Sequence, residues 1–260
     1  MNIVVCIKEV PDTTEVKIDS ETNTLKRSGV ECIINPYDLH AIEEGLRIKE
    51  KFDGRLTVIS MGPPQVKKSL KKAISLGVDE TILLSDRAFA GADTLATSYT
   101  LAQAIKKIGD IDLILCGKQA IDGDTGQVGP GIAEHLNIPH STYINDVQAD
   151  QNSITVQREF ENGHETIELQ LPALLTLNKE INEPRLPSIR GILRSREIEI
   201  PVWTKDDLDV NEDLLGLDGS PTQVIWVGTP ELNKEGDIYT GKPKEQAEKL
   251  VDELSDLQIF

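Results

Sequence analysis

The sequence predicts an α/β fold, in which a Rossmann-like parallel sheet carries helices on both faces and is followed by a β-hairpin and an extended C-terminal arm. Two observations support this fold class. Short apolar runs alternate with segments of helical periodicity, which is typical of parallel strands joined by right-handed crossover helices. The apolar runs also lack the polar alternation of half-exposed strands, which indicates a sheet buried on both faces.

Four strands are expected to form the sheet, and three helices are expected to connect them. Each predicted strand is a short apolar run, and these runs lie at residues 2–7, 55–60, 80–84 and 112–116. Apolar residues recur at helical spacing in three segments between them, at residues 37–51, 64–76 and 94–108. The second helix begins with Pro64 and ends before Gly77, and Asp93 is a suitable N-cap for the third.

The chain changes character after residue 143. Residues 154–158 and 166–171 flank the turn Asn162-Gly163 and predict a hairpin, and residues 174–177 predict another buried strand. A proline-bounded loop then leads into a short helix that ends near residue 197. We place the boundary of the first domain at residue 200.

Residues 201–260 are expected to form the C-terminal arm. Residues 205–218 carry six acids against one lysine, which predicts an extended, solvated connector. One more strand is expected at residues 222–227. Residues 244–254 predict an amphipathic helix, whose apolar face packs either on a partner or back on its own domain.

Composition argues against two classes of partner. The chain has 260 residues and a formal net charge of −17 at pH 7, and a field of this sign repels phosphate backbones. No apolar run approaches the ~20 residues that a membrane helix needs, and the N-terminus enters a strand-like run without a cationic leader. We therefore expect a cytoplasmic protein that neither binds nucleic acid nor inserts into membranes.

The three cysteines, Cys6, Cys32 and Cys116, are far apart in the sequence. Metal ligation would require a C-x-x-C pair or a nearby histidine, and neither is present, so no metal site is predicted. Cys6 and Cys116 lie inside apolar runs. We interpret them as buried packing residues, with a redox or ligand role as the alternative.

A glycine-rich loop, G-K-Q-A-I-D-G-D-T-G-Q-V-G-P-G at residues 117–131, follows the fourth strand. It matches neither of the common phosphate-binding motifs. Its glycines nevertheless allow close approach of a ligand, and a helical period begins at Ile132, so the loop leads to a helix N-terminus suited to a phosphate. Thr125 or Asp124 is expected to cap that helix. The alternative is a strand-to-helix turn without a ligand.

Four other loops are expected at the same edge of the sheet, because the carboxyl ends of parallel strands converge there. They are residues 8–12, 35–38, 61–64 and 91–94. Asp122 and Asp124 would hold a ribose hydroxyl or a metal ion there, or cap backbone amides. No nucleophile–base pair or hydrolase motif occurs, so no catalytic residue is predicted and any reaction would have to be that of a cofactor.

The sequence resembles the beta subunit of electron-transferring flavoproteins over essentially its whole length. The resemblance is carried by five motifs, V-C-I-K-E-V-P-D (5–12), N-P-Y-D with A-I-E-E-G-L-R-I-K-E (35–50), G-K-Q-A-I-D (117–122), N-E-P-R (182–185) and G-L-D-G-S-P-T (216–222). It implies a heterodimer with an alpha subunit that carries a redox-active FAD, and an arm at 201–260 that packs on this alpha subunit. It also implies that residues 1–200 form a domain of the adenine-nucleotide-binding type.

The resemblance implies which residues contact the nucleotide. These are Cys6, Asn35, Pro36, Tyr37, Asp38, Met61, Gly117, Lys118, Gln119, Ala120, Ile121, Asp122, Gly123, Asp124, Thr125, Gly126, Gln127 and Val128. In housekeeping members of the family the ligand is a structural AMP, whereas flavin-bifurcating members hold a second FAD. The run from Asp122 to Val128 looks like the bifurcating version, and so does 91–97, whose Thr94 and Thr97 would reach the flavin ring.

A bifurcating member would take a hydride from NADH onto this FAD. One electron would then pass to ferredoxin or flavodoxin, and the other would pass through the FAD of the alpha subunit to a dehydrogenase, typically of the acyl-CoA type. The alternatives that stay open are a housekeeping beta subunit with AMP, a nucleotide-binding module of the universal-stress type, and a hydrolase or ligase that handles ATP.

The family's partner-recognition loop falls on residues 182–196. The side chains expected to bind the partner are Arg185, Leu186, Ile189 and Arg190. Pro187 is expected to begin a helix, which leaves Leu186 at an exposed tip as an apolar anchor. Ile189, Ile192 and Leu193 are expected on the inward face of that helix. The alternative is a basic amphipathic helix that only balances the acidic connector.

Overall fold

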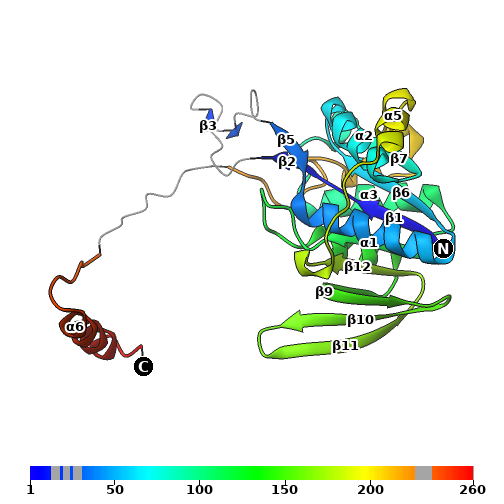
Figure 1. Cartoon of the computed structure of the whole chain (residues 1–260). Helices are drawn as coiled ribbons and strands as arrows, with labels where there is room; N and C mark the ends of the chain where they lie inside the picture. The colour runs from blue at the N-terminus through cyan, green and yellow to red at the C-terminus, as the bar shows by residue number, and fades with distance from the viewer. Residues whose placement is uncertain (13–17, 20–23, 26–30, 226–235, 260) are drawn as a thin grey trace. The chain divides into compact units, whose positions relative to one another are not determined.

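The structure is a computed structural model that describes residues 1–12, 18–19, 24–25, 31–225 and 236–259. The chain divides into two units, Met1–Ile225 and Trp226–Phe260. The first unit contains the sheet that was predicted from the alternation of strands and helices (Figure 1). It extends past residue 200, so residues 201–225 belong with the sheet domain in this division.

Seven neighbouring strands of the nine-stranded sheet run parallel to one another, and the six that follow β9 (His140–Ala149) form its main part. In spatial order they are β12 (Ala173–Leu177), β8 (Leu113–Gly117), β1 (Asn2–Cys6), β6 (Arg55–Met61), β7 (Glu80–Leu84) and β13 (Val202–Trp203). The chain builds outward from β1 through β6 to β7 and then returns to place β8 on the other side of β1. Strand order therefore reverses between β1 and β8, and parallel sheets bind ligands at such a point.

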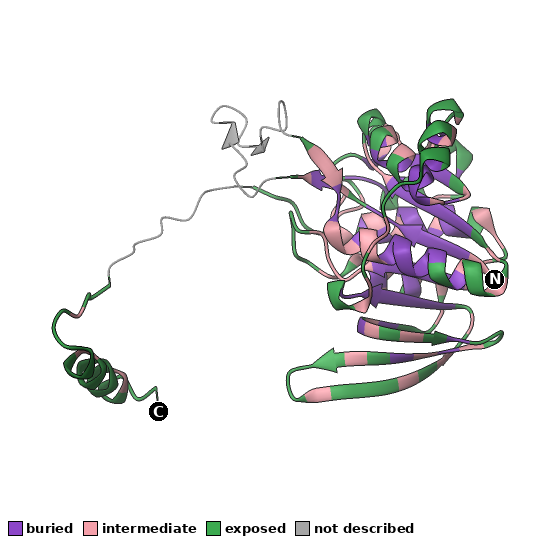
Figure 2. Cartoon of the chain, viewed as in Figure 1, coloured by how far each residue is buried: buried purple, intermediate pink, exposed green. Residues whose placement is uncertain are grey.

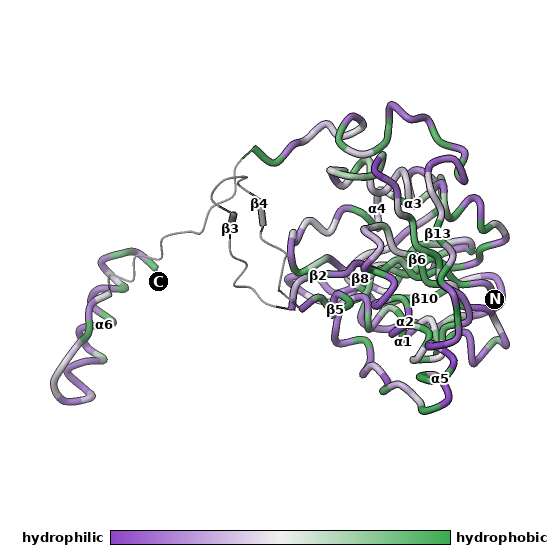
Figure 3. Tube along the Cα trace, turned by 90° about the horizontal axis from the view of Figure 1, so that it is seen from above, coloured by the Kyte–Doolittle hydropathy of each residue, from purple (hydrophilic) through white to green (hydrophobic). Residues whose placement is uncertain are grey.

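Helices cover both faces of these strands, as the sequence predicts. On one face lie α1 (Pro36–Phe52) and α2 (Lys67–Leu76), and on the other lie α3 (Thr94–Ile108) and α4 (Val128–Leu136) (Figure 3). Alternate residues of β1 divide between the two sides. Ile3 and Val5 join the core under α1 and α2, whereas Val4 and Cys6 join the core under α3 and α4. This two-sided burial explains why the strand sequences are continuously apolar.

Three more strands extend the sheet beyond β12, of which the first is parallel to β12 and the next two are antiparallel to their neighbours. They are β9 (His140–Ala149), β10 (Ser153–Phe160) and β11 (Gly163–Gln170). The predicted hairpin is confirmed as β10 and β11, which pair around Gly163. β9 was not predicted, because only three of its ten residues are buried and its polar residues hide the strand pattern. Figure 2 shows the change from the buried central strands to this partly exposed extension.

Short elements complete the first unit. Two small antiparallel pairs occur, β2 (Glu9–Pro11) with β5 (Cys32–Ile34), and β3 (Ile18–Asp19) with β4 (Thr24–Leu25). Helix α5 (Ile189–Glu197) is the predicted short helix. The described residues also contain five 3-10 turns, at Pro64–Val66, Arg87–Phe89, Lys179–Ile181, Lys205–Asp207 and Glu212–Leu214.

The expected solvated connector at residues 205–218 is wrong. Leu208 and Leu215 are buried in the core under α3 and α4, and the two 3-10 turns at 205–207 and 212–214 shape the segment around them. The prediction relied on the charge of the segment and did not consider that these two leucines would hold it against the core. The expected strand at 222–227 is also wrong for residues 222–225, which form none, and its last two residues lie outside the described part.

The second unit contains helix α6 (Pro243–Asp256), which confirms the predicted C-terminal helix. None of its residues is buried, and Leu250 and Val251 are about half exposed. Among the described residues of both units, no helix is long and apolar enough to cross a membrane.

Candidate functional site

The glycine loop begins where β8 ends, at the carboxyl edge of the sheet beside β1. Gly117, the last residue of β8, lies so close to the start of α1 that a Cβ there would meet Oδ1 of Asp38 at 2.3 Å. Only glycine fits at this position. The close approach fixes the start of the glycine loop against α1 and thereby positions everything that follows.

Asp38 ties the ends of β1 and β8 together. Its Oδ2 accepts the backbone N–H of Lys8 at 2.7 Å, and its Oδ1 accepts the N–H of Gly117 at 3.1 Å. Burial raises the pKa of Asp38 to about 7, although these two donors and Asn35 favour the carboxylate. Asp38 is thus a buried brace of the site.

Asn35 holds the next part of the glycine loop. Its Nδ2 donates to the carbonyl of Gln119 at 2.8 Å, and its Oδ1 accepts the N–H of Ile121 at 3.2 Å. Asn35 precedes α1, which begins with Pro36, but its side chain does not cap that helix. The N-P-Y-D motif therefore acts on the glycine loop through both Asn35 and Asp38.

The acids of the glycine loop have partners within the chain. Lys8 Nζ lies 2.7 Å from Oδ1 of Asp122, and Gln119 Nε2 donates to Asp124 at 2.7 Å. The N–H groups of Gly123 and Asp124 both donate to the carbonyl of Ala120, which closes a turn. These contacts shape the loop before any ligand is considered.

The predicted caps of the following helix are wrong. Helix α4 begins at Val128, a turn earlier than the apolar period at Ile132 suggested, and neither Asp124 nor Thr125 caps it. Gln127 occupies the N-cap position without a side-chain bond to the helix. Its side chain instead accepts a hydrogen bond from Thr94. The apolar periodicity of the sequence did not reveal the first turn of α4, because that turn contains two glycines and Pro130.

A run of backbone amides at the start of α4 meets the requirement for binding an anion. Within the part of the chain that the structure describes, the N–H groups of residues 125–129 donate to no other group. Gly126 has φ of 61°, which favours glycine, and a Cβ built at Gly123 would have no other group within 4 Å. Unpaired amides, an open approach and the positive end of a helix dipole fit a nucleotide phosphate.

The remaining predicted contacts lie on α3, β6 and β1, and Thr94 is joined to the glycine loop. Thr94, in the first turn of α3, donates to Gln127 Oε1 at 2.9 Å, and Thr97 lies one turn further along α3. Met61 ends β6 and packs on the core that contains Cys6. A hydrogen bond with Cys116, together with burial, raises the pKa of the Cys6 thiol, which argues for packing rather than reactivity.

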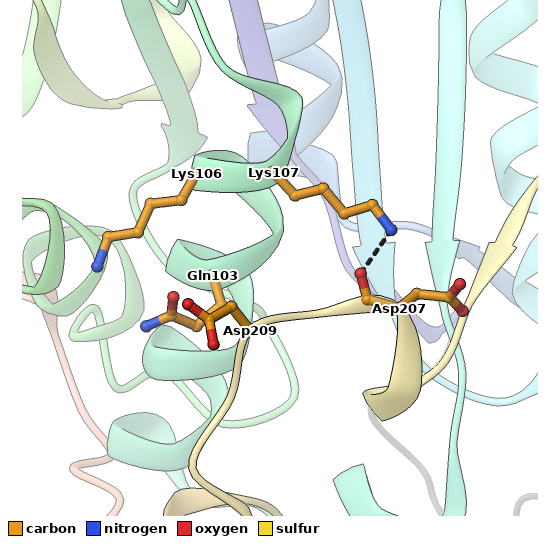
Figure 4. Close-up of a pocket in the computed structure, with 5 residues that line it drawn as sticks. All are labelled: Gln103, Lys106, Lys107, Asp207 and Asp209. Carbon is orange, nitrogen blue, oxygen red and sulfur yellow. Dashed lines mark hydrogen bonds between the residues drawn. The ribbon is translucent and has the colours of Figure 1, made fainter.

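Two aromatic residues at this edge lie under lysines. Lys118 Nζ is 4.6 Å from the ring centre of Tyr143, and Lys179 Nζ is 4.5 Å from that of Tyr37. These lysines place positive charge close to the predicted nucleotide contacts. Figure 4 shows a separate pocket, lined by Gln103, Lys106, Lys107, Asp207 and Asp209. It lies at the last turn of α3, at the other end of that helix from Thr94.

The predicted recognition loop is fixed at its base and free at its tip. Arg185 pairs with Glu43 at 2.9 Å and with Glu50 at 2.5 Å, both on α1. The hydrogen bond from Arg185 lowers the pKa of Glu50, and at Glu43 the bonds from Arg185 outweigh burial, so its pKa is lowered too. Leu186 is 88% exposed, as the sequence predicts. Helix α5 begins two residues after Pro187 and is capped by Ser188.

The predicted inward face of α5 is wrong. Ile189, Ile192 and Leu193 are exposed, and the buried residues of the helix are Gly191 and Ser195. A Cβ at Gly191 would meet the carbonyl oxygen of Ser75 at 2.2 Å, so the small residues allow the two backbones to approach. The apolar side chains and Arg190 therefore point outward beside Leu186.

Sequence reasoning missed the residues that hold these loops. Lys8 and the acids Glu43 and Glu50 were not singled out, although all three lie inside motifs that were quoted. The signal was their position inside these motifs, which becomes informative only when the spatial partner is known. In the described residues no group of three or more His, Cys, Asp or Glu side chains could hold a metal ion.

Comparison with known proteins identifies the family. Residues 22–208 match the model described as Electron transfer flavoprotein domain. The chain is 51% identical over 261 residues to the electron transfer flavoprotein subunit beta of Thermoanaerobacterium thermosaccharolyticum, with all of both chains covered. It is 47% identical over 262 residues, again with all of both chains covered, to the caffeyl-CoA reductase-Etf complex subunit CarD of Acetobacterium woodii. It is 44% identical to protein FixA of Azotobacter vinelandii over 98% of this chain and 94% of that one. The chain therefore belongs to the electron transfer flavoprotein family, as a beta subunit.

Proposed function

We propose that this beta subunit binds FAD at the glycine loop and takes part in flavin-based electron bifurcation. The observation that carries the proposal is the run of unpaired amides at residues 125–129, at the start of α4 and beside the switch in strand order. Such amides provide hydrogen bonds for a pyrophosphate without a side-chain charge. Lys8 and Lys118 add positive charge nearby.

The residues around the loop have distinct parts in this proposal. Asn35 and Asp38 hold the loop in shape. Asp122, which pairs with Lys8, would bind a ribose hydroxyl. Thr94 and Thr97 are the polar groups for the flavin ring. Bound FAD would supply hydride acceptance from NADH and release of single electrons. The side chains make and break no covalent bonds.

FAD is favoured over AMP by the space beside the loop. A Cβ at Gly123 would meet no other group within 4 Å, and Gly126 has no side chain, so there is open space at these two positions of the glycine loop. The similarity to CarD supports a dehydrogenase partner, because its name assigns that protein to a complex with caffeyl-CoA reductase. We propose an acyl-CoA dehydrogenase-type or other flavin dehydrogenase as the acceptor, with ferredoxin or flavodoxin as the low-potential acceptor.

The test is to copurify this chain with its alpha subunit and to count the flavins. Two FAD molecules per heterodimer are expected. One FAD with one AMP would contradict the proposal and assign the site to a structural nucleotide, as in the housekeeping alternative. Reduction by NADH, followed spectroscopically, tests the electron donor independently of any partner dehydrogenase.

Two matched glycine variants locate the second flavin. Gly126 and Gly109 both have a positive φ, of 61° and 70°, so alanine strains the backbone at both positions. Gly109 follows α3 at the opposite edge of the sheet. Gly126→Ala is expected to lower the second flavin content, whereas Gly109→Ala leaves two flavins per heterodimer. Equal flavin loss in both variants would show that the effect is general instability.

A further inference from the structure

The C-terminal segment 215–222, which we call the clasp, lies directly against the loop that precedes α3. The N–H of Leu217 donates to the carbonyl of Ala90 at 3.0 Å. Gly216 has φ of 54°, and a Cβ there would meet the carbonyl oxygen of Ala88 at 2.2 Å. Leu215 is buried in the core. The clasp is therefore fixed at its beginning by a core side chain and by close backbone contact.

Asp93 is the point at which the clasp reaches α3. Its Oδ1 accepts the N–H groups of Leu95 and Ala96, at 2.9 and 3.1 Å, and so caps the helix. Its Oδ2 accepts two hydrogen bonds from Thr222, one from Oγ1 at 2.8 Å and one from the backbone N–H at 3.1 Å. The N–H of Asp93 donates to Oγ of Ser220 at 2.8 Å. One carboxylate thus caps the helix and holds the clasp together.

These bonds favour a charged carboxylate. Burial alone would raise the pKa of Asp93, but the donors from Thr222, Ala96 and Leu95 together lower it below its ordinary value. Hydrogen bonds to a charged acceptor are stronger than those between neutral groups. The contact between the clasp and α3 is therefore more than an incidental surface contact.

The helix start that Asp93 caps is also part of the candidate site. Thr94 follows Asp93 directly, and its Oγ1 bonds to Gln127 in the glycine loop. We infer that Asp93, Ser220 and Thr222 are positioning residues of the nucleotide site: they hold the start of α3 against the glycine loop and make its geometry depend on the clasp. This inference rests on the proposed nucleotide binding. Beyond the clasp, Val224 and Ile225 are 78% and 89% exposed.

The coupling must act in both directions. If the clasp favours the arrangement that binds the nucleotide, bound nucleotide must in turn stabilise the clasp. The arm that continues from the clasp is the part of the chain proposed to pack on the alpha subunit. Nucleotide occupancy and the anchoring of the arm are therefore linked through Asp93.

Thr222→Val tests the inference, because it removes the hydroxyl donor and keeps the shape of the side chain. In the complex with the alpha subunit, amide hydrogen exchange at Leu95 and Ala96 is expected to become about tenfold faster, and the affinity for the bound nucleotide about tenfold weaker. The control is Thr204→Val. It removes the same kind of bond, from Oγ1 to Asp207 Oδ2 at 2.9 Å, beside the last turn of α3 and not beside its first. It is expected to change neither quantity.

Ser220→Ala provides a second variant and is expected to change both quantities in the same direction. Unchanged exchange in both variants would overturn the inference, and so would faster exchange with full retention of the nucleotide. If the wild-type complex holds AMP instead of a second FAD, the flavin assignment fails, while the same two measurements on AMP still decide the role of Asp93. A wild-type complex without any nucleotide at this site would overturn both proposals.

Discussion

Asp38 shows how a single buried side chain can organise the glycine loop. It accepts backbone hydrogen bonds from the ends of two neighbouring strands and lies against Gly117, where no side chain fits. The motif N-P-Y-D marked this position from the sequence. Its partners Lys8 and Gly117 could not be assigned, because they are joined to Asp38 only by the pairing of β1 with β8.

The stability of the chain is expected to depend on pH through Asp38. Its pKa rises from 3.8 to about 7 on folding, so folding takes up a proton between these values. The stabilisation is full below the unfolded pKa and is lost as the pH rises through the folded one. The free energy of unfolding should therefore fall by up to about 1.4 kcal/mol per pH unit in this window.

Asp38→Asn cannot titrate and isolates this contribution. Chemical denaturation should be measured for the wild type and the variant between pH 3.8 and about 7. As the pH rises, the free energy of unfolding of the wild type should fall relative to that of the variant. A difference that is independent of pH would show that Asp38 remains charged throughout in the folded protein.

Helix α5 shows where reasoning about elements succeeds and where it fails. Its existence and approximate ends were predicted, but its apolar residues were placed inward. That reasoning assumes that large apolar residues face the core. Here the requirement for close backbone approach to Ser75 selects Gly191 and Ser195 for the inward face, which leaves Ile189 and Leu193 outside.

Gly191→Ala is expected to destabilise the contact between α5 and α2. Its Cβ would meet a backbone oxygen at 2.2 Å, which cannot move as a flexible side chain would. Overpacking of this kind costs about 1–3 kcal/mol. Thermal and chemical denaturation should show the loss, and Gly236→Ala, with no other group within 4 Å of its Cβ, should show none. Equal stability of the two variants would mean that α5 shifts freely on α2.

The exposed tip of the predicted recognition loop, just before α5, leads to a second prediction at this scale. Leu186→Ala is expected to slow electron transfer to the partner dehydrogenase about tenfold or more, mainly by weakening association, because a buried leucine contributes about 1.5–3 kcal/mol. The flavin content should not change. Leu214→Ala removes another exposed leucine outside the loop and is the control. Lost flavin, or an unaltered rate, would contradict docking through Leu186.

At the scale of the whole molecule, the sequence specified the sheet domain better than its boundary. The strand–helix alternation predicted the parallel centre because buried strands and amphipathic helices leave distinct patterns. It did not show β9 or β13, which are partly exposed, or that two leucines bind residues 205–218 to the core. These contacts join segments far apart in sequence, so no local pattern reveals them.

Two truncations separate the contributions of the arm. A chain that ends after Ile225 is expected to keep the melting temperature of the isolated full-length beta subunit, since no residue of α6 is buried. It should associate more weakly with the alpha subunit on size-exclusion chromatography. A chain that ends after Leu214 loses Leu215 and the clasp, and should be less stable by about 2 kcal/mol or more. If the chain that ends after Ile225 associates with the alpha subunit as strongly as the full-length chain, the proposed role of the arm is contradicted.

Helix α1 touches both functional loops, and this has a consequence for electron transfer. Near its start, Asn35 and Asp38 hold the glycine loop, while Glu43 and Glu50, further along, hold Arg185 beside Leu186. A helix advances by about 1.5 Å per residue and does not stretch, so the twelve positions from Asp38 to Glu50 act as a spacer of roughly 18 Å. The separation between the glycine loop, proposed to bind the cofactor, and Leu186, proposed to dock the dehydrogenase, is thereby built into the length of α1. A single inserted residue in α1 would alter this separation and rotate one loop out of alignment with the other.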